Sequence, residues 1–165
     1  MQIGRTLRHL FATRWATRRR FTPDVLRRIE ADIAALEQRH AGEIRFAIET
    51  ALDLPDLWYG TTSRERAVSV FGLLGVWDTA GNNGVLIYVL MADHDVEIVA
   101  DRGIDARVPK ADWGAVCREM KTHFAAGRHG EGAAAGIAAV GRLLAEHFPH
   151  DGGDRNEQPD RPVVL

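Results

Sequence analysis

NNGVLIYVLMADHDVEIVADRGI, residues 82–104, is the stretch that decides the fold of this chain. Its first part, Val85 to Ala92, is continuously apolar, which is typical of a strand that is covered on both faces. Residues 92–95 then predict a turn, and residues 95–101 alternate between two faces, as a returning strand does. The stretch therefore predicts an antiparallel hairpin with Asp101 beside Asn83 and with helices above and below it.

The segment before this hairpin predicts a strand, a helix and a parallel crossover. Residues 43–50 alternate with Ile44, Phe46 and Ile48 on one face, which indicates a first strand. Residues 52–60 have the composition of a loop, and a helix is predicted over residues 63–74. A strand, helix, strand order of this length favours a right-handed crossover, so the first two strands are expected to be parallel.

Helices flank this unit on both sides in the sequence. Thr22 and Pro23 have the features of a helix start, the apolar spacing continues to Leu36, and the helix is predicted to run to about His40. Two more helices are predicted after the hairpin, one from residues 109–112 to 124 and one over residues 131–148. We therefore expect a three-layer α/β/α sandwich over residues 21–149, with a small mixed sheet. Residues 150–165 are rich in Gly, Asp and Pro, which predicts a disordered tail.

Residues 1–20 form a separate basic segment. Nine of the first 28 residues are Arg or His, and Asp24 is the only acid among them. Apolar residues recur at helical spacing from Ile3 to Trp15, so an amphipathic helix is predicted. Three interpretations stay open: packing of the apolar stripe on the domain or on a second copy, docking on an anionic membrane surface or a protein partner, and an organelle transit peptide.

Composition excludes several classes of protein. A net charge of −2 over 165 residues is no nucleic-acid signature, and the single Cys117 allows neither an internal disulfide nor a cysteine-based zinc site. No apolar run approaches the length of a transmembrane segment, and we find no secretory signal. A cytoplasmic protein, peripheral to the membrane at most, is the expectation.

The predicted strand directions bring oxygen-bearing side chains to one edge of the sheet. Glu43 begins the first strand, Asn82 and Asn83 precede the second, and Asp101 ends the third, with Asp78 nearby. Carboxylate and amide oxygens are the ligands of hard divalent cations, so these five residues are candidates to bind Ca²⁺ or Mg²⁺. The alternative is structural: the asparagines hold a tight turn, Asp101 pairs with Arg102 or another nearby cationic group, and Glu43 is solvated.

Part of the chain resembles the TPM-domain family, which includes thylakoid-lumen phosphatase-like proteins and the photosystem II repair factor of cyanobacteria. The resemblance spans residues 21–148 and rests on the Asn83-Gly84 entry to an apolar strand, the Asp93 turn, residues 96–98 and the exit at residues 102–104. It implies an α/β/α sandwich with a small mixed sheet. For some members it also implies calcium or another divalent ion, acid phosphatase activity, and a role in membrane-protein repair or quality control.

Some features depart from the family pattern. His94 stands where the family turn usually has Arg, and Arg102-Gly103 replaces a Gly-aromatic-Gly exit. Two functions follow as hypotheses. The first is a binding or adaptor domain with a divalent cation at the sheet edge. The second is a metal-dependent phosphatase in which Asp78 and Asp101 hold an activated water and Arg102 stabilises the charge of the phosphate.

Overall fold

The computed structural model describes residues 3–149 and 156–165, and a four-stranded mixed sheet lies at its centre, in the order β3-β2-β1-β4. Strands β1 and β2 are parallel, and β2 and β3 are antiparallel, as the sequence predicts. The strands are β1 (Glu43–Glu49), β2 (Gly84–Leu90), β3 (Asp95–Ala100) and β4 (Val163–Val164).

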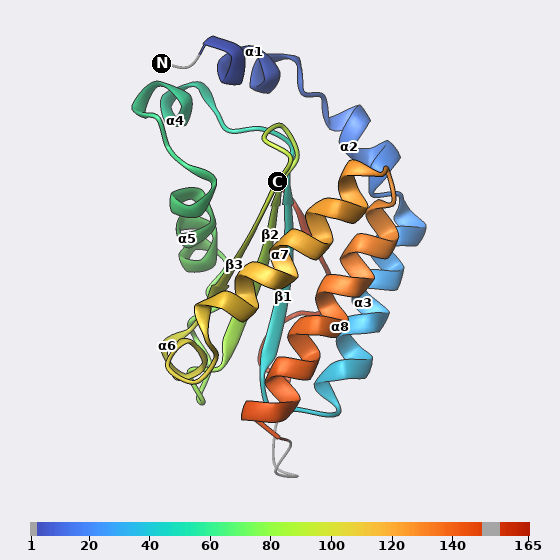
Figure 1. The fold of residues 1–165 in the computed structure, drawn as a ribbon, viewed down its shortest axis with the longest axis vertical. Helices are drawn as coiled ribbons and strands as arrows, with labels where there is room; N and C mark the ends of the chain where they lie inside the picture. The colour runs from blue at the N-terminus through green and yellow to red at the C-terminus, as the bar shows by residue number, and fades with distance from the viewer. Residues whose placement is uncertain (1–2, 150–155) are drawn as a thin grey trace.

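Helices cover both faces of this sheet, which confirms the α/β/α sandwich (Figure 1). One face carries α3 (Pro23–Glu37), α7 (Lys110–Ala125) and α8 (His129–His147), and the other carries α5 (Ser63–Leu73) with part of α4 (Leu54–Tyr59). Two short helices, α1 (Ile3–Phe11) and α2 (Arg14–Arg20), lie at the end of the molecule where β1 and β2 finish, and α6 (Arg102–Asp105) follows β3.

Alternation along the strands divides the core into two clusters. Ile44, Phe46 and Ile48 share one face, as predicted, and this face packs against the α3, α7 and α8 layer. Leu86 and Tyr88 of β2 pack in the opposite cluster with α5. All seven residues of β2 are buried, which explains why its sequence is continuously apolar. Each large apolar side chain buried in this way contributes about 1.5–3 kcal/mol, so the central strands hold the layers together.

Two of the predicted local structures are wrong. Residues 52–60 contain the helix α4, because Asp53 caps its start by accepting from the Asp56 N–H at 2.9 Å and Gly60 ends it in the left-handed conformation. The single N-terminal helix is two helices, because Thr13 accepts from the Ala16 N–H at 3.2 Å and begins α2 as a new element.

The C-terminal segment also differs from the disordered tail expected over residues 150–165. Residues 150–155 lie outside the described residues, but residues 156–165 dock on the domain. Val163 and Val164 pair in parallel with Ala47 and Ile48, and the Leu165 N–H donates to the Ile48 carbonyl at 2.8 Å. This pairing covers the free edge of β1, which would otherwise expose unpaired backbone groups.

Candidate functional site

The polar edge predicted from the sequence exists at the amino ends of β1 and β2. Glu43 stands opposite Gly84 in the parallel register, and the Asp101 N–H donates to the Gly84 carbonyl at 2.8 Å. The Glu43 N–H donates in turn to the Asn83 carbonyl at 3.1 Å. Glu43, Asn83 and Asp101 therefore share one margin of the sheet, as the strand directions predict.

The Glu43 carboxylate is used by the C-terminal segment. It is buried, and it accepts from the backbone N–H groups of Glu157 and Gln158 at 3.0 and 3.1 Å. The side-chain amide of Gln158 then donates to the Gly75 carbonyl at 3.0 Å. Glu43 thus anchors the segment that leads to β4.

Asp101 and Asn83 each keep one buried oxygen without a hydrogen-bond partner among the described residues. Asp101 Oδ1 accepts from the Arg102 N–H at 2.7 Å and caps α6, while its Oδ2 has no partner. The Asn83 amide donates to the Ala41 carbonyl, while its Oδ1 has no partner. Burial of a polar atom without a hydrogen bond is unfavourable, so these two oxygens are candidates for a ligand.

The other three candidates lie on the surface. Asp78, Asn82 and Arg102 are exposed. Asn82 adopts a φ of 48°, and its carbonyl accepts from the Gly103 N–H at 3.1 Å, so its backbone shapes the turn, in line with the structural interpretation. Gly103 is required there, because a Cβ would lie 2.6 Å from the Asn82 carbonyl oxygen.

This geometry limits how a cation could be held. Glu43 begins β1 and Asp101 directly follows β3, the two strands that flank β2, so their backbones are about 10 Å apart. Their carboxylates already accept backbone hydrogen bonds on opposite sides of Gly84. Within residues 3–149 and 156–165, no group of three or more His, Cys, Asp or Glu is arranged to hold a metal ion. Asp101 Oδ2 and Asn83 Oδ1 are oxygens of the kind that a hard cation takes, whereas Glu43, whose two oxygens accept backbone hydrogen bonds, does not fit the set.

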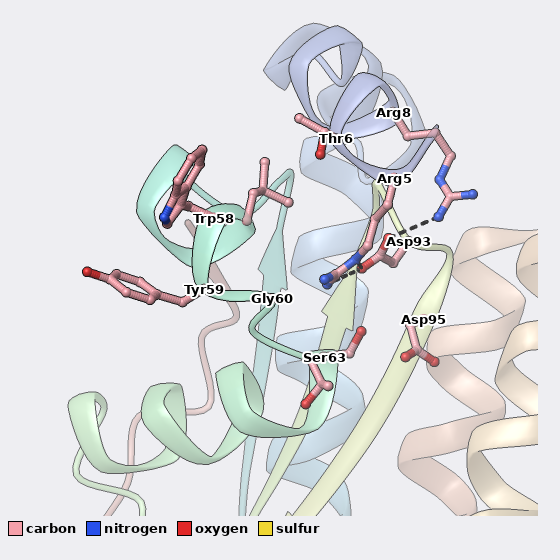
Figure 2. Close-up of a pocket in the computed structure, with 11 residues that line it drawn as sticks. Arg5, Thr6, Arg8, Trp58, Tyr59, Gly60, Ser63, Asp93 and Asp95 are labelled. Carbon is pink, nitrogen blue, oxygen red and sulfur yellow. Dashed lines mark hydrogen bonds and ion pairs between the residues drawn. The ribbon is translucent and has the colours of Figure 1, made fainter. Parts of the chain in front are cut away.

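A second polar region, which the sequence did not indicate, lies at the opposite end of the sheet. A cleft of about 610 Å³ opens between α1, α4 and the β2–β3 turn, at the carboxyl ends of β1 and β2 (Figure 2). Arg5 donates to Asp93 Oδ2 from Nε at 2.9 Å and from Nη2 at 2.7 Å. Burial alone would raise the pKa of the Asp93 carboxyl, but the bonds from Arg5 and His9 outweigh it and lower that pKa.

His9 completes this contact from inside the protein. Its Nδ1 accepts from the Leu52 N–H at 3.0 Å, and its Nε2 lies 3.0 Å from Asp93 Oδ1. With Nδ1 occupied by the Leu52 N–H, Nε2 is the ring nitrogen that faces the Asp93 carboxylate. Arg5, His9 and Asp93 fasten α1 to the β2–β3 turn, across more than 80 residues of sequence. In the sequence, only the i, i+4 spacing of Arg5 and His9 indicates that these two residues share one face of a helix.

A buried charged network lies at the end of β1. Arg66 donates to both oxygens of Glu49, at 2.9 and 2.7 Å, and the Tyr88 hydroxyl donates to Glu49 Oε2 at 2.5 Å. Burial, followed by the bond to the Glu49 carboxylate, raises the pKa of the Tyr88 hydroxyl. All of these polar groups are paired with one another, so the network fixes the end of the sheet.

The layer order and the mixed sheet define an α/β/α sandwich domain, and comparison with known proteins identifies its family. A family model described as the TPM domain matches residues 18–143. The chain therefore belongs to the TPM-domain family. The match begins within α2, so α1 lies outside it, as does β4.

Two solved structures share this fold. The chain is similar to the BA42 protein from the psychrophilic bacterium Bizionia argentinensis, with a TM-score of 0.73 and 30% identity over 87% of this chain and 94% of that one. It is also similar to the N-terminal domain of a protein from P. gingivalis, with a TM-score of 0.60 and 18% identity over 78% and 81% of the two chains. The second likeness concerns the fold alone. Among curated proteins no match was found.

Proposed function

We propose that this TPM domain is a binding, or adaptor, domain that takes a divalent cation, Ca²⁺ or Mg²⁺, beside Asp101. The observation that carries the proposal is the pair of buried, unpartnered oxygens, Asp101 Oδ2 and Asn83 Oδ1, at one margin of the sheet. A hard cation would satisfy both oxygens and would be attracted by the carboxylate. Exposed Asn82 and Asp78 are the candidates to contact it from the solvent side.

The number of protein ligands decides what kind of cation site this would be. Ca²⁺ takes six to eight oxygens, while Mg²⁺ keeps several waters and needs one or two carboxylates. Of the two buried carboxylates predicted as ligands, Asp101 keeps an oxygen without a partner among the described residues, whereas both Glu43 oxygens accept from the C-terminal segment. The set therefore favours Mg²⁺, or Ca²⁺ at modest affinity.

Thermal melts with and without each cation test this proposal. A ligand at a hundred times its dissociation constant adds about 2.7 kcal/mol to the free energy of unfolding. The matched variant is Asp101→Asn, which keeps the oxygen that caps α6 and removes the charge. Asp105→Asn, an exposed carboxylate of the same helix, is the control. An equal cation-induced shift in wild type and Asp101→Asn would contradict the proposal, as would no shift in wild type.

A metal-dependent acid phosphatase is the second candidate. The observation in its favour is that exposed Arg102 directly follows Asp101, so a phosphate could meet a cationic side chain at this margin. In this scheme a bound metal supplies the activated water, Asp78 and Asp101 orient it, and Arg102 binds the phosphate. Hydrolysis of a phosphomonoester by the wild type and by Asp101→Asn distinguishes the candidates. Equal rates in the two proteins would remove Asp101 from any catalysis.

The partner of an adaptor is the remaining part of the proposal. We propose a cytoplasmic, peripheral role in membrane-protein repair or quality control, in which residues 1–20 meet a protein partner or an anionic membrane. No helix in residues 3–149 or 156–165 is long and apolar enough to cross a membrane. Contact with a bilayer would therefore be made by surface groups in this part of the chain.

A further inference from the structure

We propose that the end of the molecule formed by α1, α2 and α4 docks on an anionic lipid surface. This inference deepens the partner surface proposed above and is independent of the cation site. It begins with the way α1 sits on the domain. The polar side of α1 faces inward, where Arg5 and His9 contact Asp93. His9 is 3% exposed and accepts the Leu52 N–H, so this side of the helix is fixed.

The apolar side of the same helix consequently faces solvent. Phe11 is 77% exposed, Trp15 at the start of α2 is 66% exposed, and Leu7 and Leu10 are exposed as well. An amphipathic helix of a soluble domain normally turns its apolar stripe toward the core. Here the ion pairs with Asp93 hold the stripe outward, which is the orientation that an interfacial helix needs.

Helix α4 adds two aromatic rings at the same end of the molecule. Trp58 is 74% and Tyr59 84% exposed, and Figure 1 shows α4 close to α1. In Figure 2 both rings point away from the Arg5–Asp93 contact, toward the outside. The caps at Asp53 and Gly60 hold this short helix in place, so the rings are displayed by a defined structure. Trp and Tyr are the residues that concentrate where a membrane meets water.

The positive charge of residues 3–20 indicates what kind of partner binds this surface. Residues 3–20 contain six arginines and no acidic residue, although the whole chain has a net charge of −2. Arg14, Arg18 and Arg20 are exposed and Arg19 lies over the Trp15 ring, 4.7 Å from its centroid. Basic groups interleaved with exposed aromatic rings complement anionic headgroups. A second copy fits less well, because two arginine clusters would face each other.

Vesicle co-sedimentation, with the tryptophan emission maximum as a second readout, tests the proposal. We expect the full chain to bind vesicles that contain phosphatidylglycerol, to leave vesicles of phosphatidylcholine alone unbound, and to be released by high salt. The emission should shift to the blue on binding, since Trp15 and Trp58 enter the interface. Each arginine near an anionic surface changes the partition coefficient about five-fold, so Arg18→Gln with Arg19→Gln and Arg20→Gln should lower it roughly a hundred-fold.

Matched variants separate this surface from general charge and from general hydrophobicity. Arg39→Gln with Arg118→Gln and Arg142→Gln removes the same charge from exposed positions just after α3, on α7 and on α8, and should leave the partition close to that of the wild type. Phe11→Ser with Trp15→Ser should abolish binding, while Leu73→Ser, which alters an exposed leucine of α5, should not. Circular dichroism checks that each variant is folded.

Three outcomes would overturn the proposal. The first is equal loss of binding in the two triple-arginine variants, and the second is no binding of the folded wild type to phosphatidylglycerol vesicles. The third is a dimer, detected by light scattering, that Phe11→Ser with Trp15→Ser converts to monomer, which would assign the surface to a second copy. Asp101→Asn should bind vesicles like the wild type, so failure of the cation site and failure of the membrane surface are distinguishable.

Discussion

Replacement of Glu37 by Gln should make the protein more stable at alkaline pH and leave it unchanged in mild acid. Glu37 ends α3, and its Oε1 accepts from the Ile44 N–H at the start of β1, at 3.0 Å. Burial raises the pKa of its carboxyl from 4.5 to about 9; the Ile44 bond opposes the rise, and the neighbouring Glu43 and Asp160 carboxylates add to it. The folded protein therefore holds a proton on Glu37 at neutral pH.

The direction of this pH dependence follows from the number of protons that the folded and the unfolded states bind. Between the two pKa values the folded state binds one more proton than the unfolded state, so the free energy of unfolding falls as pH rises through this window. If the folded state bound one more proton throughout, the free energy of unfolding would fall by about 1.4 kcal/mol per pH unit. Because Glu37 is only partly buried, we expect a smaller total, about 1–2 kcal/mol between about pH 5 and pH 8.

The Gln amide can accept the same Ile44 N–H and needs no proton. Glu37→Gln should therefore stabilise the protein by about 1–2 kcal/mol near pH 8, or about 3–6 °C in Tm, and by close to zero near pH 5. Urea unfolding at the two pH values measures this. Glu30→Gln, an exposed position of the same helix, is the control. Parallel pH profiles for the wild type and Glu37→Gln would refute the reasoning.

Three further changes test the packing and the contacts that position the two ends of the sheet. Tyr88→Phe removes one donor from buried Glu49 and should cost about 1–2 kcal/mol in urea unfolding. Gly84→Ala places a methyl group against the Val76 carbonyl oxygen and should cost about 1–3 kcal/mol or more, measured in the same way. Asp93→Asn removes the charge that holds α1, so amide hydrogen exchange in residues 3–11 should accelerate about ten-fold or more.

Each of these changes has a control of the same chemistry at an unconstrained position. Tyr59→Phe alters an exposed hydroxyl, Gly72→Ala adds a methyl group where nothing lies within 4 Å, and Asp95→Asn breaks only a partly exposed pair with Lys121. The packing explanation fails if Gly72→Ala costs as much as Gly84→Ala. Unchanged exchange in α1 after Asp93→Asn would show that other contacts hold the helix.

The sheet could be predicted from the sequence because its signals are local. An unbroken apolar run in β2 and alternation in β1 determine which faces are buried, and the intervening helix determines that the strands are parallel. Two residues of β4 carry no such signal. Val163 and Val164 pair with β1 because Glu43 accepts the backbone N–H groups of residues 157 and 158, a contact across more than 110 residues.

The orientation of α1 could not be predicted from the local sequence either, because it too depends on a contact between distant segments. Its apolar stripe indicates a helix but not which side faces the domain, and burial of the stripe on the domain was one of the open interpretations. Asp93, more than 80 residues further along the chain, determines which side of α1 faces the domain, because it contacts Arg5 and His9. For the polar edge, strand direction placed Glu43 and Asp101 at one margin, but it could not show that backbone N–H groups already occupy Glu43.

The distance between the two ends of the sheet separates the two proposed functions. Strand β1 has seven residues, so its ends are about 20 Å apart, while the Debye length in physiological salt is about 8 Å. A cation beside Asp101 is therefore too far from α1 to bridge the arginine surface to lipid headgroups. Vesicle binding through α1, α2 and α4 should therefore need no Ca²⁺ and should persist in EDTA. Binding that requires Ca²⁺ would instead mean that the Asp101 margin faces the bilayer, and the N-terminal helices would then lie on the side away from the lipid.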